Sequence, residues 1–333
     1  SLIYNKSFTS NYNFNNTEIS YIKNDNNKKD YLIIITSSSI ELYDIQSNII
    51  INEININNEL GYRTPMIQLE ENKYMFAFKE RENEREGSII LGNLLIDFDN
   101  NLIDKINKKK IDYNDDNAKF NETIISCDIT HDNDSNNKYI LCAYINDKKQ
   151  LEISSFSYDF DLINKKIDEK VLLDDRYFVK IAYFKYFNKF VVMNALNETY
   201  TRIRYFKYKN NMFLNQLTFI TDDENDYLDE NMAQLSPYLS YNDIISLNTR
   251  KIIRISINSN DATISRYQFH SNDISLSIKN YKINEILNNN NYNYFQHPRL
   301  FLLNNIIVIC LSTIYLNERR TGYFYLSYPS PIN

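Results

Sequence analysis

Two short apolar runs, separated by a turn that bears Asn or Lys, recur along the whole chain, and this repeat limits the possible folds more than any other feature. The clear copies cover residues 19–36, 65–78, 124–144, 179–193 and 298–310. A further copy lies between Met232 and Ile257, where Ile244–Leu247 fits either the first or the second run. Short apolar runs bounded by polar turns predict β-strands.

Each pair of runs is followed by an alternating strand that ends in an aromatic residue, a polar turn and another strand. In the second copy these are Ser88–Phe98, the turn Asp99–Asn101 and the strand Leu102–Ile106. Alternation of apolar and polar residues indicates half-buried strands. Four strands in a unit of about 40 to 65 residues are typical of a β-propeller blade. The repeat therefore predicts an all-β propeller with four antiparallel strands in each blade.

Six blades account for the chain as one domain over residues 1–333. Their approximate limits are 17–56, 64–110, 121–170, 178–220, 231–283 and 297–328. The sixth unit offers only three strands, the last being Gly322–Tyr328, whereas the strand Leu2–Phe8 precedes the first unit. We expect Leu2–Phe8 to complete the sixth blade, because such pairing closes the ring and leaves no long unpaired edge.

The second copy also resembles a known repeat. Pro65–Phe78, followed by residues 87–98, is similar to the P-x-hydrophobic-x-x-L-x-[ND]-G-x-[FY]-hydrophobic-V-x-W propeller repeats of large secreted and cell-surface proteins. This chain departs from that pattern, since Lys73 or Asn305 stands where Gly is usual and Phe or Tyr replaces Trp. The resemblance implies a propeller in an extracellular setting and a generally non-enzymatic role. The resemblance implies no catalytic residue in this chain.

The three cysteines do not form a disulfide framework by their spacing. Cys127 and Cys142 fall on consecutive predicted strands of one hairpin and could lie side by side, whereas Cys310 is remote. An odd count without CxxC spacing fits neither a disulfide-stapled scaffold nor a metal site. We therefore expect small buried hydrophobic residues at these positions, with Cys310 free.

Composition and motifs argue against several classes of function. A net charge of −6 and a pI near 5.3 disfavour a nucleic-acid-binding protein. No run approaches the ~18 to 20 apolar residues that a membrane-spanning helix needs. Asp222–Asp226 lacks the Gly and the spacing of a calcium loop, and there is no Gly-rich phosphate loop. We therefore expect no metal, no cofactor, no nucleic acid and no membrane insertion.

Catalytic groups are sparse along the chain. The histidines His131, His270 and His297 fall in different units and cannot easily converge. Two carboxylates that face each other across a propeller channel can serve a glycosidase. Acidic residues at the entrances of the inner strands, such as Glu18 and Glu122, would be present in any acidic chain. No catalytic residue is assigned, and we expect a non-catalytic protein.

The best candidate surface is the propeller face with the links between blades and the loops of the middle hairpins, called the loop-rich face below. Tyr and Arg gather there, and these residues are favoured at interface hot spots. The partner-binding candidates are Tyr62, Arg63, Arg81, Arg85, Arg176, Tyr177, Tyr227, Tyr292, Tyr294, Phe295, His297, Arg299, Tyr315, Arg319 and Arg320.

These observations predict a recognition or scaffolding module that binds a protein partner through the loop-rich face. We expect it to be extracellular or at the cell surface, and otherwise cytoplasmic. The alternative is a carbohydrate-binding or glycosidase-like propeller that uses the mouth of the central channel near His297 and Arg299.

Overall fold

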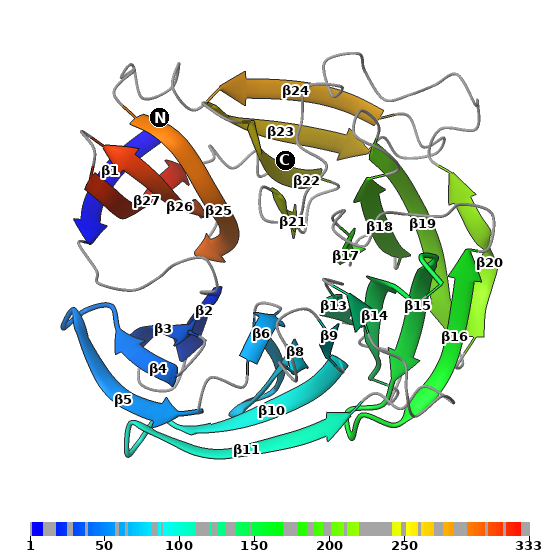
Figure 1. Cartoon of the computed structure of the whole chain (residues 1–333), viewed down its shortest axis with the longest axis horizontal. Helices are drawn as coiled ribbons and strands as arrows, with labels where there is room; N and C mark the ends of the chain where they lie inside the picture. The colour runs from blue at the N-terminus through cyan, green and yellow to red at the C-terminus, as the bar shows by residue number, and fades with distance from the viewer. Residues whose placement is uncertain are drawn as a thin grey trace. The chain divides into compact units, whose positions relative to one another are not determined.

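Every regular element of the computed structural model, over the residues that it describes, is a β-strand (Figure 1). The model describes residues 2–8, 18–24, 29–36, 39–56, 60–63, 66–80, 86–87, 89–110, 120–121, 125–130, 138–146, 148–168, 179–184, 189–195, 201–209, 212–219, 242–247, 251–258, 261–269, 276–282, 292–303, 306–315 and 318–327. This confirms the predicted all-β class.

Four sheets of the described ranges are antiparallel meanders of four strands in chain order. The first contains β2 (Glu18–Asn24), β3 (Lys29–Ile35), β4 (Ser39–Asp44) and β5 (Ile49–Asn55). Another contains β13 (Ser126–Ile129), β14 (Ile140–Ile145), β15 (Leu151–Phe156) and β16 (Leu162–Asp168). The next contains β17 (Val179–Phe184), β18 (Lys189–Ala195), β19 (Thr201–Lys209) and β20 (Met212–Phe219). The last contains β21 (Asn242–Leu247), β22 (Lys251–Asn258), β23 (Asp261–Phe269) and β24 (Leu276–Lys282).

The last of these meanders settles an ambiguity in the sequence. Ile244–Leu247 lies in β21, which pairs with β22 and is the first strand of its sheet.

The sheet of the second repeat departs from the simple pattern. Its order is β11 (Leu102–Lys110), β10 (Ile89–Asp97), β8 (Lys73–Glu80) and β6 (Leu60–Arg63), and β7 (Ile67–Glu70) also pairs with β8. The expected single first strand is therefore replaced by two short strands. Pro65 lies between them in the sequence, and a proline has no N–H to donate to a sheet.

The chain's first strand pairs with its last. The sheet order is β1 (Leu2–Phe8), β27 (Glu318–Ser327), β26 (Ile306–Tyr315) and β25 (Tyr292–Leu303). The antiparallel register runs from Leu2 opposite Leu326 to Phe8 opposite Thr321, as expected for these two segments. The expected strand starts were wrong: β25 begins at Tyr292 instead of Pro298, and β27 begins at Glu318 instead of Gly322.

The chain divides into two compact units. Unit 1 comprises residues 1–14, 182–207 and 214–333, and unit 2 comprises residues 15–181 and 208–213.

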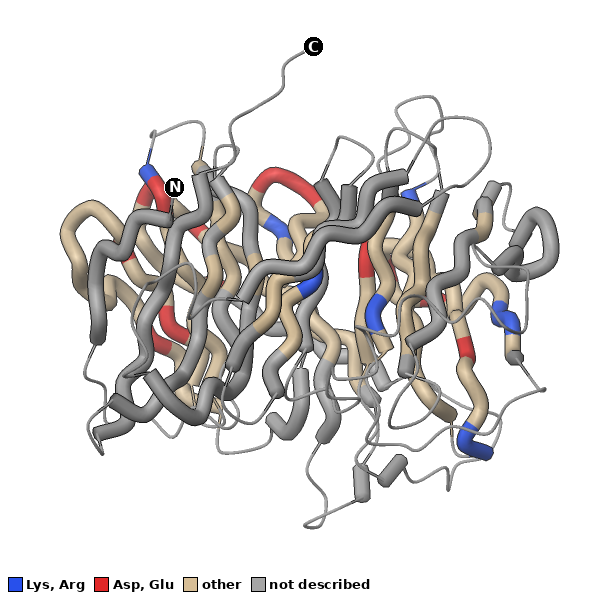
Figure 2. The backbone as a smooth tube through the Cα atoms, turned by 90° about the horizontal axis from the view of Figure 1, so that it is seen from above, with Lys and Arg blue, Asp and Glu red and all other residues tan. Residues whose placement is uncertain are grey.

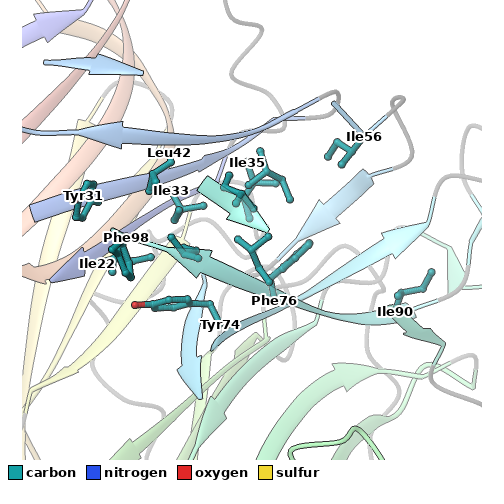
Figure 3. Packing of buried hydrophobic residues seen from close by; sticks show 14 residues of the cluster. Ile22, Tyr31, Ile33, Ile35, Leu42, Ile56, Tyr74, Phe76, Ile90 and Phe98 are labelled. Atoms are coloured by element: carbon teal, nitrogen blue, oxygen red, sulfur yellow. The ribbon is translucent and has the colours of Figure 1, made fainter. Parts of the chain in front are cut away.

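The core of unit 2 explains why its second strands are continuous apolar runs. Tyr74 and Phe76 of β8 belong to a cluster with Tyr31 and Ile33 of β3 (Figure 3). Met75 and Ala77 of the same strand belong to a second cluster, with residues of β13 to β15. Successive side chains of a strand point to opposite faces. The strand is therefore buried on both faces, between neighbouring sheets.

An aromatic residue after the third strand joins adjacent sheets of unit 2. The ring of Phe98 lies 5.1 Å from that of Tyr31 and 6.4 Å from that of Tyr74. Hydroxyl groups of the first strands add further links. Ser20 Oγ accepts the N–H of Met66 at 2.5 Å, and Ser126 Oγ accepts the N–H of Ile181 at 3.1 Å.

Asp and Asn form the turns that glycine forms in many β-proteins. Asp44 Oδ1 accepts the N–H groups of Gln46 and Ser47, at 2.8 and 3.1 Å. Asn48 then adopts the left-handed conformation, with φ 61°. The next sheet repeats the arrangement with Asp97 and with Asn101, whose φ is 53°. Asn tolerates this region because its short polar side chain bonds locally.

Candidate functional site

The register of β25, β26 and β27 gathers several candidate residues at one end of a sheet in unit 1. Tyr292 lies opposite Tyr315, and Tyr315 lies opposite Glu318. Arg319 and Arg320 follow, opposite Ile314 and Thr313. Directly opposed residues have Cβ atoms about 4.5 to 5.5 Å apart. Tyr292, Tyr315 and Glu318 therefore lie side by side on three strands, and Arg319 and Arg320 follow directly on β27.

The rest of the β25 candidates lie further along an irregular strand. Tyr294, Phe295 and His297 fall in a segment with two register shifts, one between Asn293 and Gln296 and one between Gln296 and Arg299. Pro298 lies there too and cannot donate a backbone N–H. Such bulges redirect side chains and are common next to active sites.

Tyr62 and Arg63 occupy the equivalent place in unit 2. Both lie in β6, which pairs with the end of β8 through Leu60 opposite Glu80 and Arg63 opposite Phe78. They therefore lie beside the strand end that leads into residues 81–85. Arg81 and Arg85 fall outside the described residues, as do Arg176, Tyr177 and Tyr227.

A two-stranded ribbon follows this loop. β9 (Glu86–Gly87) pairs with β12 (Phe120–Asn121), with Phe120 opposite Gly87 and Asn121 opposite Glu86. The ribbon ties the middle-hairpin loop of the second repeat to the link that leads into the third. Sequence reasoning missed it, because two-residue strands are too short to show a period.

A buried carboxylate organises the middle hairpin of the sheet formed by β13, β14, β15 and β16. Glu152 is only 1% exposed. Its Oε1 accepts the hydroxyl of Tyr144 at 2.9 Å, and its Oε2 accepts the amide N–H of Asn146 at 3.2 Å. Asn146 Oδ1 in turn accepts the N–H groups of Lys148 and Gln150. Glu152 therefore fixes the β14–β15 turn, a role that no sequence motif indicates.

A partly buried tyrosine lies near the first strands of two sheets in unit 2. Burial, with a contribution from the charges of Glu70 and Asp128, raises the pKa of Tyr158 to about 12. The Lys138 ammonium lies 5.7 Å from the centre of its ring. Because the phenol stays protonated at neutral pH, Tyr158 cannot act as a general base there.

The cysteines differ from expectation in one respect. Cys127 and Cys142 are directly opposite on β13 and β14, as predicted. They form a disulfide with an S–S distance of 2.13 Å and a Cα–Cα distance of 4.1 Å, so the expectation that both are unbonded small hydrophobic residues is wrong. Register explains the bond, since opposed strand positions bring the two sulfur atoms together. Cys310 lies in β26 of a different sheet.

Neither a metal site nor a membrane-spanning helix is found among the described residues. Those residues contain no group of three or more His, Cys, Asp or Glu side chains placed to hold a metal ion. They also contain no helix with the length and apolar character needed to cross a membrane. Described acidic (red) and basic (blue) positions are scattered among the other described residues (Figure 2).

The chain matches no protein-family model and no curated protein sequence. Among solved structures, the Trypanosoma rangeli sialidase in complex with 2,3-difluorosialic acid is similar, with 8% identity and a TM-score of 0.52; the match covers 93% of this chain and 54% of the sialidase chain.

The Cps50 (Swd1) β-propeller domain of Myceliophteria thermophila shares 12% identity over 93% of this chain and 84% of its own, with a TM-score of 0.47. The polysaccharide lyase Uly1 shares 7% identity over 94% and 78%, with a TM-score of 0.47. At these identities the likeness concerns the fold alone.

Proposed function

We propose that this chain is a six-bladed β-propeller that acts as a non-catalytic recognition or scaffolding module, binding a protein partner outside the cell through its loop-rich face. Repeated four-stranded antiparallel meanders, the building units of propellers, support the fold. The pairing of β1 with β27 supports closure, because it gives the sheet of β25, β26 and β27 a fourth strand.

The register at the β26–β27 turn carries the functional proposal. Tyr292, Tyr315 and Glu318 lie directly opposite one another on three neighbouring strands, and Arg319 and Arg320 are the next two residues of β27. Tyr and Arg combine a large contact area with directed hydrogen bonds, and they dominate the binding energy of many protein interfaces. The β6–β8 pairing repeats this combination with Tyr62 and Arg63.

The disulfide supports the extracellular setting. Cys127 and Cys142 are bonded within a core hairpin, and Cys142 is fully buried. Disulfides form and persist in oxidising compartments and are rare in the cytosol.

The test is quantitative capture from the native source with purified wild-type and variant protein as bait, followed by affinity measurement with the purified partner. The variant Arg319→Glu/Arg320→Glu should weaken binding at least tenfold. The control Lys165→Glu/Lys166→Glu makes the same charge change on β16 and should bind like the wild type. Capture of no specific protein, or equal weakening by both variants, would refute the proposal.

One observation favours the carbohydrate alternative: β25 is irregular around His297, and β-bulges often border active sites. In that case, glycan-array binding or glycoside hydrolysis should be lost in His297→Ala and Arg299→Ala but kept in Arg319→Glu/Arg320→Glu. This pattern would replace a protein partner with a sugar.

A further inference from the structure

The middle of the end strand β1 carries a sequon for N-linked glycosylation. Asn5-Lys6-Ser7 fits the acceptor pattern Asn-x-Ser/Thr, and Asn5 is the central residue of β1. The same pattern begins at four other positions, which are Asn15, Asn121, Asn133 and Asn197. In a chain so rich in asparagine the pattern alone selects no residue, so the strand pairing has to decide.

The sequon at Asn5 lies wholly within a strand of a four-stranded sheet. Asn121 lies in the two-residue strand β12 opposite Glu86, and the Thr123 of its sequon falls outside the described residues. The sequons at Asn15, Asn133 and Asn197 begin outside the described residues. The described strands therefore allow the surroundings of Asn5 to be judged from the register of both the asparagine and the hydroxyl residue.

A β-bulge frees Asn5 from a cross-strand neighbour. Tyr4 lies opposite Phe324 and Lys6 lies opposite Tyr323, with a register shift between them, so Asn5 is the extra residue of the bulge. The extra residue of a bulge stays out of the ladder of paired residues. A bulky substituent on Asn5 therefore has no directly opposed residue of β27 to displace.

The position opposite Ser7 holds a glycine. Gly322 of β27 is one of only four glycines in the chain. Glycine inside a strand weakens it and often marks a place where a ligand approaches closely. Because glycine has no side chain, β27 leaves space opposite the hydroxyl residue of the sequon.

The strand also forms the end of its sheet. Among the described strands β1 pairs with β27 alone, at the opposite end of the sheet from β25 (Figure 1). Its sequence is largely apolar, and Lys6 is its only charged residue. An apolar end strand is a template for pairing with other chains, and natural proteins block such edges. A substituent at Asn5 would interrupt this edge at its centre, leaving three residues on either side.

We propose that Asn5 is an N-glycosylation site and that its sugar chain covers the open edge of β1. The Nδ2 atom of Asn5 attacks the first carbon of a lipid-linked oligosaccharide. The bond from that carbon to the lipid diphosphate breaks, the lipid diphosphate leaves, and the nitrogen loses one proton. The product carries a bulky, solubilising group at the surface. This proposal rests on the extracellular setting in the proposed function, because sequons are modified in secreted proteins.

Secretion of the whole chain from animal cells behind a signal peptide tests the site. Enzymatic removal of N-glycans in heavy-oxygen water converts each modified asparagine to a labelled aspartate, and peptide mapping should find this label at Asn5. Asn5→Gln and Ser7→Ala should each lower the mass of the secreted protein by one glycan, whereas Ser7→Thr should keep it. Asn121→Gln removes a different sequon and should leave the label at Asn5 unchanged. An unlabelled Asn5 in the secreted wild type would overturn the proposal.

Aggregation measures whether the sugar covers the edge. Asn5→Gln and Ser7→Ala should both aggregate at least about twice as fast as the glycosylated wild type, because each leaves the edge of β1 open to pairing. Asn121→Gln should aggregate like the wild type. Thermal melting of each variant checks that the fold is intact. Equal aggregation of all four proteins would show that the sugar does not protect this edge.

The outcome is separable from that of the proposed function. Capture of a protein partner is measured with enzymatically deglycosylated wild type and with Arg319→Glu/Arg320→Glu, neither of which depends on the sugar. A failed capture with a labelled Asn5 would refute the protein partner and keep the glycosylation site. Successful capture with an unlabelled Asn5 would keep the partner and refute the site.

Discussion

The phenolic oxygen of Tyr208 lies 2.6 Å from the hydroxyl oxygen of Ser155, and this contact joins β19 to β15. The Tyr208 ring also meets Tyr139 edge-on, with 5.0 Å between ring centres. Both oxygens are buried, since Ser155 is inaccessible and Tyr208 nearly so. A tyrosine near the end of a third strand thus repeats the role of Phe98, and adds a hydrogen bond to the ring contact.

A double-mutant cycle should measure this hydrogen bond. Tyr208→Phe and Ser155→Ala should each lower the free energy of unfolding by about 1 kcal/mol, because each removes a buried bond but leaves the ring packed. The carbonyl of Asn164 also accepts from Ser155 Oγ, which limits the loss in Tyr208→Phe. Urea unfolding of the double variant should show a coupling energy of about 0.5 to 1.5 kcal/mol. Strict additivity would show that the contact contributes nothing.

Removal of the disulfide should destabilise the chain. Cys127→Ala/Cys142→Ala opens a loop closed across 15 residues, which should cost about 3 kcal/mol through the greater entropy of the unfolded chain. Urea unfolding measures this loss, and Cys310→Ala is the matched control, with a smaller effect expected. Non-reducing peptide mapping should find Cys127 linked to Cys142. A peptide that links Cys310 to either of them would contradict the register of β13 and β14.

Acid should weaken the turn at Asp44. Burial alone would raise the pKa of this carboxyl, but the N–H groups of Ser47 and Gln46 and the nearby Lys29 lower it below the ordinary 3.8. Because the folded pKa lies below the unfolded one, the stabilisation is present above about pH 4 and is lost as the pH falls through the folded pKa. Asp44→Asn should therefore flatten the fall in melting temperature below pH 4.

The control for that measurement is Asp104→Asn, which removes an exposed carboxylate from β11. It should leave the acid profile close to that of the wild type. If Asp44→Asn has the same profile as the wild type between pH 2 and 5 (roughly the range in which carboxylates titrate), Asp44 has no part in acid unfolding.

Strand periodicity was the part of the fold that could be read from the sequence. The apolar run Tyr74–Phe78 predicted a strand, and Tyr31, which belongs to the same core cluster as Tyr74, lies in the equivalent run of the previous repeat. The disulfide could not be predicted from the odd cysteine count, because its formation depends on the register that opposes Cys127 to Cys142. The start of β25 at Tyr292 was missed, because a proline resembles a strand boundary and the strand was therefore expected to begin at Pro298.

The sequence could predict which kinds of residue belong to the candidate site, but not how the strands arrange them. The sequence predicted that Tyr292, Tyr315 and Arg319 belong to one face; in the strand register Tyr292 lies opposite Tyr315, and Arg319 follows Glu318, the residue opposite Tyr315 on β27. The role of Glu152 in fixing the β14–β15 turn could not be predicted from the sequence, because a carboxylate on an alternating strand resembles any exposed polar residue. Its buried hydrogen bonds depend on Tyr144, which lies opposite it on the neighbouring strand.

Deletion of residues 1–10 should test the closure of the propeller. It removes β1 and leaves β27, which includes the apolar run Tyr323–Leu326, as an unpaired edge. The loss of a seven-residue ladder and its apolar side chains should cost at least about 3 kcal/mol and promote aggregation. A synthetic peptide of residues 1–10, added in trans, should raise the melting temperature of the truncated chain, whereas a scrambled peptide should not. If the truncated chain melts like the full chain, β1 does not hold the last sheet together and the closure proposal is wrong.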